Sequence, residues 1–355
     1  MVPLVVIAAL LVLWIVREQL MRALSTPTVH LSLVHDRSGC EALVVDVRMG
    51  DGRWMLFQLD TGYAGAPVLS TDYLARGGAI MRGGVQRRYV ARTEASGERG
   101  GDAAVHAFLA RCASCRMFTS GCTMTLASIG AVREQATPLI LVDSLSLDGH
   151  TIDSHRGDLV VALPLAHSPH ILTMDYLLHR APALLCPARG TLRLRVPLLA
   201  QMALHPTMVL LPLELSDGAP LVRMEVGGVP DLRIVIDTGA SAPLSLNAAA
   251  AARVAARVAD TPDVARKVVQ TGVNGERVCS DVIRATVRIM SLDFGRMQVL
   301  VNQTPTRNAD GYAGMGMLRA MDILLEADQI GLRRSGLETR DLPDSVLRAG
   351  RCAAA

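Results

Sequence analysis

One short phrase occurs twice in this chain, an apolar run that ends in Asp-Thr-Gly. The first copy is MLFQLDTG, over residues 55–62, and the second is LRIVIDTG, over residues 232–239. A short apolar run predicts a buried strand, and the glycine lets the backbone turn sharply where the strand ends. Each copy would hold an aspartate, Asp60 or Asp237, on a rigid loop. Two such aspartates face to face would share a proton.

Other segments indicate an internal duplication. The pattern Thr-x-x-x-Gly-Glu-Arg occurs at 93–99 and again at 271–277. Its first threonine lies 33 residues after Asp60, and its second lies 34 residues after Asp237. The segment 272–275, Gly-Val-Asn-Gly, is typical of a hairpin turn because Asn-Gly accepts positive φ angles. The chain therefore consists of two related halves.

With these motifs the chain resembles the pepsin-like and retropepsin-like aspartic proteases, whose signature is two apolar residues followed by Asp-Thr-Gly and a small residue. A second family element, an apolar-apolar-Gly turn, matches residues 310–318 around Gly314. The corresponding segment of the first half, 171–177, has Thr173 where the family has glycine. The resemblance implies a mostly β, bilobal acid-protease fold of two related β-barrel-like lobes.

The two halves differ in length. Asp60 to Thr173 is 113 residues, whereas Asp237 to Gly314 is 77. We therefore expect an insertion that contains several cysteines in the first half, and a join between the halves within 197–212, where prolines interrupt the pattern. The predicted domains are an anchor at 1–22, an N-terminal lobe at 29–197 with the insertion at about 106–158, a C-terminal lobe at 205–335 and a tail at 336–355.

The resemblance implies that Asp60 and Asp237 are the catalytic pair. Two carboxyls held close together cannot both ionise, so one is a base while the other is still an acid. The base would deprotonate a water lying between them, and the acid would donate to the scissile carbonyl. The resemblance also implies the supporting residues: Thr61, Gly62, Thr238 and Gly239 in the active-site loops, and flap hairpins at Ala95, Ser96 and Gly97 and at Gly272, Val273, Asn274 and Gly275.

One departure from the pepsin pattern concerns the residue after each triplet. Pepsin-like proteins have Ser or Thr there, and its hydroxyl can donate to the aspartate; here the residues are Tyr63 and Ala240. The loss of donors to the ionised form predicts a less acidic pair and activity nearer to neutral pH. The phrase Ala240-Ser241 resembles the retropepsin version.

Composition is that of a packed globular protein. Of 355 residues, 50% are hydrophobic and 19% are charged, which is enough for two cores of ordinary domain size. The net charge is +3 and aromatic residues make up only 3%, so no basic, aromatic-rich surface for nucleic acid is expected. We expect a polypeptide substrate, no cofactor, and a monomer, since one chain supplies both halves.

The N-terminus carries an uninterrupted apolar run over residues 2–16, followed by Arg17 and Arg22. Extended to residue 21, it predicts an uncleaved single-pass membrane helix through residues 2–21. The alternatives are a cleaved signal peptide and a buried soluble helix. Because both arginines follow the run, the body of the protein is expected on the cytoplasmic side.

Seven cysteines leave several arrangements open. Cys112, Cys115 and Cys122 could hold a metal with His106, form a disulfide or remain reduced; reduced thiols are favoured, and no metal site is predicted. The remaining cysteines, Cys40, Cys186, Cys279 and Cys352, are expected to be isolated thiols.

The sequence therefore predicts a membrane-anchored aspartic endopeptidase, which hydrolyses peptide bonds with a water activated between Asp60 and Asp237. The alternative is a catalytically inactive relative, a membrane protein that binds peptides or proteins through the same cleft.

Overall fold

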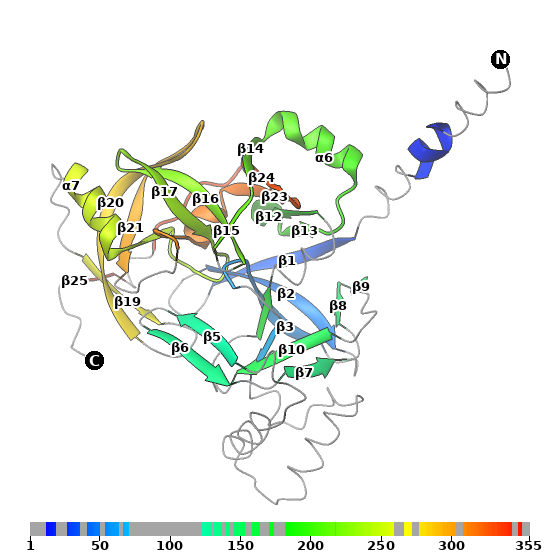
Figure 1. Ribbon diagram of the computed structural model, residues 1–355, viewed down its shortest axis with the longest axis horizontal. Coiled ribbons are helices and arrows are strands. Elements are labelled where there is room, and N and C mark those ends of the chain that lie inside the picture. Colours follow the sequence, from blue (N-terminus) through cyan, green and yellow to red (C-terminus); the bar gives the residue numbers. More distant parts are fainter. Residues whose placement is uncertain are drawn as a thin grey trace, which may run out of the picture.

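The computed structural model of this protein is mostly β (Figure 1). Its strands form two large sheets and one two-stranded sheet, β5 (Thr123–Ser128) with β6 (Ala131–Ala136). The structure describes residues 12–18, 27–35, 41–49, 54–63, 67–70, 123–128, 131–136, 139–142, 145–148, 150–152, 158–163, 170–173, 182–216, 218–258, 266–271, 277–302, 308–342 and 347–349.

The larger sheet contains the strand that leads to Asp60. Its order is β14-β24-β23-β12-β13-β1-β2-β3-β11-β4-β10-β7, with β8 attached to β2 and β9 to β8. Its strands from the first half are β1 (Thr28–His35), β2 (Glu41–Met49), β3 (Trp54–Asp60), β4 (Val68–Ser70), β7 (Leu139–Val142), β8 (Leu145–Leu147), β9 (His150–Ile152), β10 (Asp158–Leu163), β11 (His170–Thr173), β12 (Ala183–Cys186) and β13 (Thr191–Arg193).

The second sheet contains the strand that leads to Asp237. Its order is β15-β16-β17-β22-β18-β21-β20-β19-β25. The strands are β15 (Glu214–Ser216), β16 (Ala219–Val226), β17 (Val229–Ile236), β18 (Leu244–Asn247), β19 (Arg266–Thr271), β20 (Arg277–Ile289), β21 (Leu292–Asn302), β22 (Gly311–Ala313) and β25 (Leu347–Ala349). Strand β25 pairs with β19, so part of the predicted tail joins this sheet.

The strands around the two aspartates follow the same order. The path β2-β3-β11-β4-β10 in the first half corresponds step for step to β16-β17-β22-β18-β21 in the second. In each path the aspartate strand runs parallel to a strand from much later in the half, β11 or β22. Asp60 is level with Thr173 in this pairing, which puts Thr173 at the position equivalent to Gly314, as predicted from the sequence.

An antiparallel hairpin precedes each aspartate. Strands β2 and β3 pair antiparallel, as do β16 and β17. The second hairpin turns through Gly227 and Gly228, whose φ angles of 55° and 75° are those of a tight turn that favours glycine at both positions. A Cβ on Gly227 would lie 2.6 Å from Val258 Cγ2, so the turn also packs against the end of a helix.

That helix is α7 (Ala248–Arg257), which follows the second triplet. Asn247 caps it, because its side-chain oxygen accepts from the Ala250 N–H at 2.8 Å. Its buried face, which includes Ala250, Ala251 and Val254, packs into the main hydrophobic core.

The two halves share one continuous sheet. Strands β12, β13 and β1 from the first half join β23 (Met321–Leu325), β24 (Gln329–Arg334) and β14 (Val209–Pro212) from the second. The junction is the antiparallel pair β12–β23, in which Leu184 lies opposite Leu324. Helix α6 (Leu198–Leu204) lies over this shared sheet (Figure 1), and Ala200 and Leu204 pack on Leu184 and Leu324.

The predicted single-pass membrane location is contradicted. Within the described part of the chain, no helix is both long enough and apolar enough to cross a bilayer. Of the segment 1–22, the structure describes residues 12–18, which are helical but far fewer than the roughly 20 residues that a spanning helix needs. The expected anchor at 1–22 and the cytoplasmic orientation derived from it are therefore withdrawn.

One prediction about the cysteines is also wrong. Cys279, expected to be an isolated thiol, is disulfide-bonded. Cys186 is free and buried, as expected. Cys40, Cys112, Cys115, Cys122 and Cys352 lie outside the described residues, as does His106.

Candidate active site

The two Asp-Thr-Gly loops meet where the halves face each other. Strand β3 ends at Asp60, and β17 ends one residue before Asp237. The Asp237 N–H donates to Ala313 O of β22 at 2.9 Å, so the parallel neighbour strand holds the start of this loop. The structure thus brings together the two aspartates that the sequence separates by 177 residues.

The threonines of the triplets link the loops through four hydrogen bonds. The Thr61 N–H donates to Thr238 Oγ1 at 3.1 Å, and the Thr238 N–H donates to Thr61 Oγ1 at 3.0 Å. Each hydroxyl then donates to a carbonyl of the opposite half, Thr61 to Ile236 at 2.6 Å and Thr238 to Leu59 at 2.7 Å. Both threonines are buried, so these bonds are shielded from water and fix the spacing of the loops.

The glycines of the triplets allow the carboxyl groups to cross over the opposite loop. A Cβ on Gly62 would lie 2.4 Å from Asp237 Cγ, and a Cβ on Gly239 would lie 2.4 Å from Asp60 Oδ2. Real Cβ atoms do not come so close to other heavy atoms. Each glycine is therefore required by the aspartate of the other half.

Backbone amides orient both carboxyl groups. Asp60 Oδ1 accepts from the N–H groups of Gly62 at 2.9 Å and Tyr63 at 3.0 Å. Asp237 Oδ1 accepts from those of Gly239 at 2.8 Å and Ala240 at 3.2 Å. Each carboxyl group lies against the glycine of the opposite loop, so the side chains of Asp60 and Asp237 are close enough for each to affect the ionisation of the other.

The environment raises the pKa of both carboxyls. For Asp60, burial is the largest cause, and the negative charge of Asp237 and the hydrogen bond to it raise the pKa further, well above its ordinary value. Burial also raises the pKa of Asp237, against the hydrogen bond from Asp60 and the amides of Gly239 and Ala240, which lower it. The pair can hold one proton at a pH where isolated aspartates have lost theirs.

Tyr63 and Ala240 supply backbone donors to the carboxyls. Burial, and secondarily the charge of Asp60, raises the pKa of the Tyr63 phenol, so this side chain is neutral beside the pair. Ala240 has no hydroxyl to offer. The expectation that the pair is less acidic than in pepsin-like sites stays a prediction, because the pKa values are raised by burial and, at Asp60, by the other carboxyl.

The predicted flap residues, Ala95, Ser96, Gly97, Gly272, Val273, Asn274 and Gly275, lie outside the described residues. The strands that flank the second of these hairpins are described. Strands β19 and β20 pair antiparallel up to Thr271 opposite Arg277. The two strands of the hairpin predicted from the Asn-Gly turn are therefore present and paired.

Sequence reasoning missed one polar residue of the site, Gln58. It interrupts the apolar run before the first triplet, and its Nε2 donates to Gly239 O at 2.9 Å. The sequence did contain a sign of this residue's role, because Gln58 is polar where the corresponding residue of the second half, Val235, is apolar.

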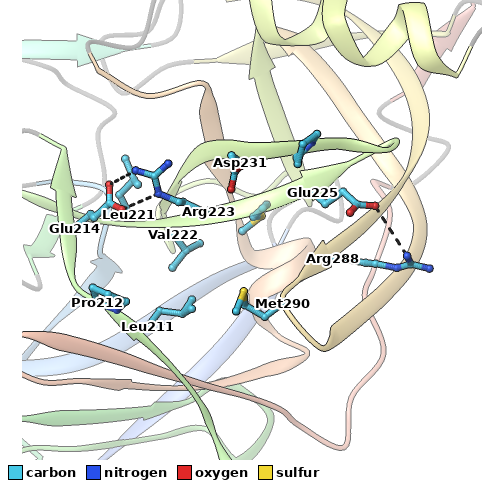
Figure 2. A pocket seen from close by; sticks show the side chains of 12 residues that line it. Leu211, Pro212, Glu214, Leu221, Val222, Arg223, Glu225, Asp231, Arg288 and Met290 are labelled. Atoms are coloured by element: carbon cyan, nitrogen blue, oxygen red, sulfur yellow. Dashed lines mark hydrogen bonds and ion pairs between the residues drawn. The ribbon is translucent and has the colours of Figure 1, made fainter.

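A separate pocket of about 270 Å³ lies in the second half (Figure 2). Its apolar lining includes Leu211, Val222 and Met290, and residues 60–63 and 237–240 do not line it. Four of its charged side chains form ion pairs, Arg223 with Glu214 at 2.9 Å and Arg288 with Glu225 at 4.0 Å. The pocket is thus distinct from the carboxyl pair. Within the described ranges, no group of three His, Cys, Asp or Glu side chains is arranged to hold a metal ion.

Comparison with known proteins gave likenesses in structure only. No protein-family model and no curated protein matches the sequence. Among solved structures, the chain is similar to the aspartic proteinase from Irpex lacteus (10% identity, 90% of this chain and 100% of that chain, TM-score 0.47). It is also similar to Basic 7S globulin from soybean (10%, 89% and 99%, TM-score 0.44) and to a retropepsin-like aspartic protease from Rickettsia conorii (18%, 35% and 90%, TM-score 0.27).

The architecture of this chain is mostly β, with one aspartate strand in each of two large sheets. Because these likenesses are distant, the chemistry of this chain is inferred from its own strand order and from the carboxyl pair of Asp60 and Asp237.

Proposed function

We propose that this protein is an aspartic endopeptidase, with Asp60 and Asp237 as its catalytic residues. The observation that carries the proposal is the pairing of the Asp60 and Asp237 carboxyls, each set against the glycine of the opposite loop and held by two backbone amides, with crossed threonine bonds linking the loops. A structural role alone does not need two carboxyls in this arrangement, because their burial and mutual repulsion destabilise the fold.

The geometry suits the activation of water. The ionised carboxyl takes a proton from a water held between the pair, and the protonated carboxyl donates its proton to the scissile carbonyl oxygen. In the next step the protons move in the opposite sense, and one is delivered to the nitrogen of the leaving amine. The threonine bonds keep the two loops at the spacing that both steps require.

The proposed substrate is a polypeptide, and the proposed unit is a monomer, because one chain contributes both aspartates. We propose the division into halves at 29–197 and 205–335, with a tail at 336–355. Thr61, Gly62, Thr238 and Gly239 support the loops, and the hairpins at 95–97 and 272–275 are the proposed flaps.

The test is cleavage of a mixed peptide library by the full-length protein between about pH 3 and pH 8. Asp60→Asn and Asp237→Asn should each abolish cleavage, and a statine-type mimic of the tetrahedral intermediate should inhibit the unsubstituted protein. Asp328→Asn is the matched control, since Asp328 is an exposed aspartate in another turn.

Cleavage that survives in either dyad variant would refute the proposal. A folded protein that cleaves no peptide at any pH would instead favour a peptide-binding function for the same cleft.

A further inference from the structure

Gln58 connects the strand that carries Asp60 with the loop that carries Asp237. It lies two residues before Asp60 on β3, and its Nε2 donates to Gly239 O at 2.9 Å. Because a carbonyl oxygen only accepts, the amide nitrogen must be the atom that faces it. The bond is partly buried and joins residues 181 apart in the sequence.

The carbonyl of Gly239 and the N–H of Ala240 belong to one planar peptide unit. That N–H donates to Asp237 Oδ1 at 3.2 Å. The hydrogen bond from Gln58 to the Gly239 carbonyl therefore also fixes the direction of the Ala240 N–H, which lies on the opposite side of the same peptide plane. A hydrogen bond to the carbonyl also polarises the peptide unit and strengthens its N–H as a donor.

The other half has no equivalent amide. The register of β3 with β11 and of β17 with β22 puts Val235 at the position that corresponds to Gln58. Val235 has no polar side-chain atom, so it cannot hold the Gly62–Tyr63 peptide unit that donates to Asp60. The two halves of the site are thus related in backbone but differ in this one donor.

We propose that Gln58 is a positioning residue that makes the carboxyl pair unequal, so that Asp237 is the carboxylate and Asp60 is the acid in the resting protein. The proposal deepens the proposed function, because it names which carboxyl activates the water. Around Asp237, the titratable groups within the described part of the chain are Asp60 and, next to Asp60, Tyr63.

The test uses Gln58→Met, which keeps the length of the side chain and removes the donor. Carbon-13 NMR of the aspartate carboxyls, assigned with Asp60→Asn and Asp237→Asn, gives the two apparent pKa values of the pair. We expect the lower value to rise by about 0.5 to 1 unit, the effect of losing one indirect hydrogen bond. The acidic limb of the kcat/KM profile should move by the same amount, whereas KM should change little.

Gln201→Met is the matched control. Gln201 lies on helix α6, in the segment between the two halves, and its Nε2 also donates to a backbone carbonyl, that of Val196 at 2.5 Å. It should leave both apparent pKa values unchanged. Gln58→Asn, whose amide is one methylene shorter, gives a second test if Gln58→Met does not fold.

Unchanged apparent pKa values in both Gln58 variants would overturn the inference. The test of the role of Gln58 can be distinguished from the test of the endopeptidase activity. A shift in the titration of a protein that cleaves nothing would support the role of Gln58 and refute the endopeptidase, whereas cleavage with identical titrations would do the reverse.

Discussion

Thr61 and Thr238 exchange hydrogen bonds in both directions across the boundary between the two halves, each N–H to the hydroxyl of the other. Each hydroxyl is at the same time a donor and an acceptor, so removal of either one leaves two buried backbone groups without their partner.

Thr61→Val should therefore reduce both stability and activity. Valine has the same shape but no hydroxyl, so the Thr238 N–H and the Ile236 carbonyl lose their bonds, and we expect a loss of about 2–4 kcal/mol in the free energy of unfolding. Thr61→Ser should recover most of it. Denaturant unfolding measures the change, with Thr207→Val, at an exposed threonine, as a control expected below about 1 kcal/mol. Equal effects at positions 61 and 207 would contradict the prediction.

Gly62→Ala should disrupt the carboxyl pair directly. The added Cβ would be 2.4 Å from Asp237 Cγ, so the carboxyl must move or the loops must separate. We expect a fall of about 100-fold or more in kcat/KM, since misplacement by about 1 Å has effects of this size. Gly336→Ala is the control, because nothing lies within 4 Å of its added Cβ. If Gly62→Ala retained full activity, the close approach described here would be wrong.

Asp60→Asn should stabilise the protein in a pH-dependent way. Folding raises the pKa of Asp60, so the folded state binds the Asp60 proton more tightly than the unfolded state does. The stability that this proton contributes is lost as the pH rises from the pKa of the unfolded state through the higher pKa of the folded state. Asparagine does not titrate and avoids this loss. The Tm of the variant should exceed that of the unsubstituted protein at pH 7 by about 2–4 °C, and the difference should vanish below about pH 4. A variant with a lower Tm at pH 7 would contradict the sign.

Glu41→Gln should loosen the contact between the halves. Glu41 is buried at the start of β2, and its Oε1 accepts from Arg319 in the second half and, at 2.7 Å, from Arg340 in the tail that follows it. The substitution leaves these guanidinium groups without their counter-charge, and we expect a loss of about 2–3 kcal/mol in the free energy of unfolding. Glu338→Gln, at an exposed Arg334 pair, should cost less than about 1 kcal/mol. Thermal unfolding of both variants decides the point.

Local sequence signals account for much of the local structure. The two hairpins and helix α7 with its Asn247 cap follow from turn residues, apolar runs and capping preferences that act within a few positions. The duplicated triplets predicted that Asp60 and Asp237 would meet, because related halves pack about a common axis.

Long-range and asymmetric features were beyond the sequence pattern. The ion pair of Glu41 with Arg319 joins residues 278 apart, and nothing local to Glu41 marks it. The bond from Gln58 to Gly239 is likewise visible only when the halves are assembled. The membrane location was predicted from apolar composition alone, but within the described residues no helix is long and apolar enough to cross a bilayer.

The shared sheet has a consequence for any attempt to divide the chain. Strands β12 and β23 cover each other's edge, with Leu184 opposite Leu324 at the centre of the pair. Expressed alone, either half would present that edge with its N–H and C=O groups unpaired, a surface that recruits another strand. In the isolated first half, β12 of a second copy could take the place of β23. Such a fragment would therefore tend to self-associate through the strand edge that is paired internally in the intact chain.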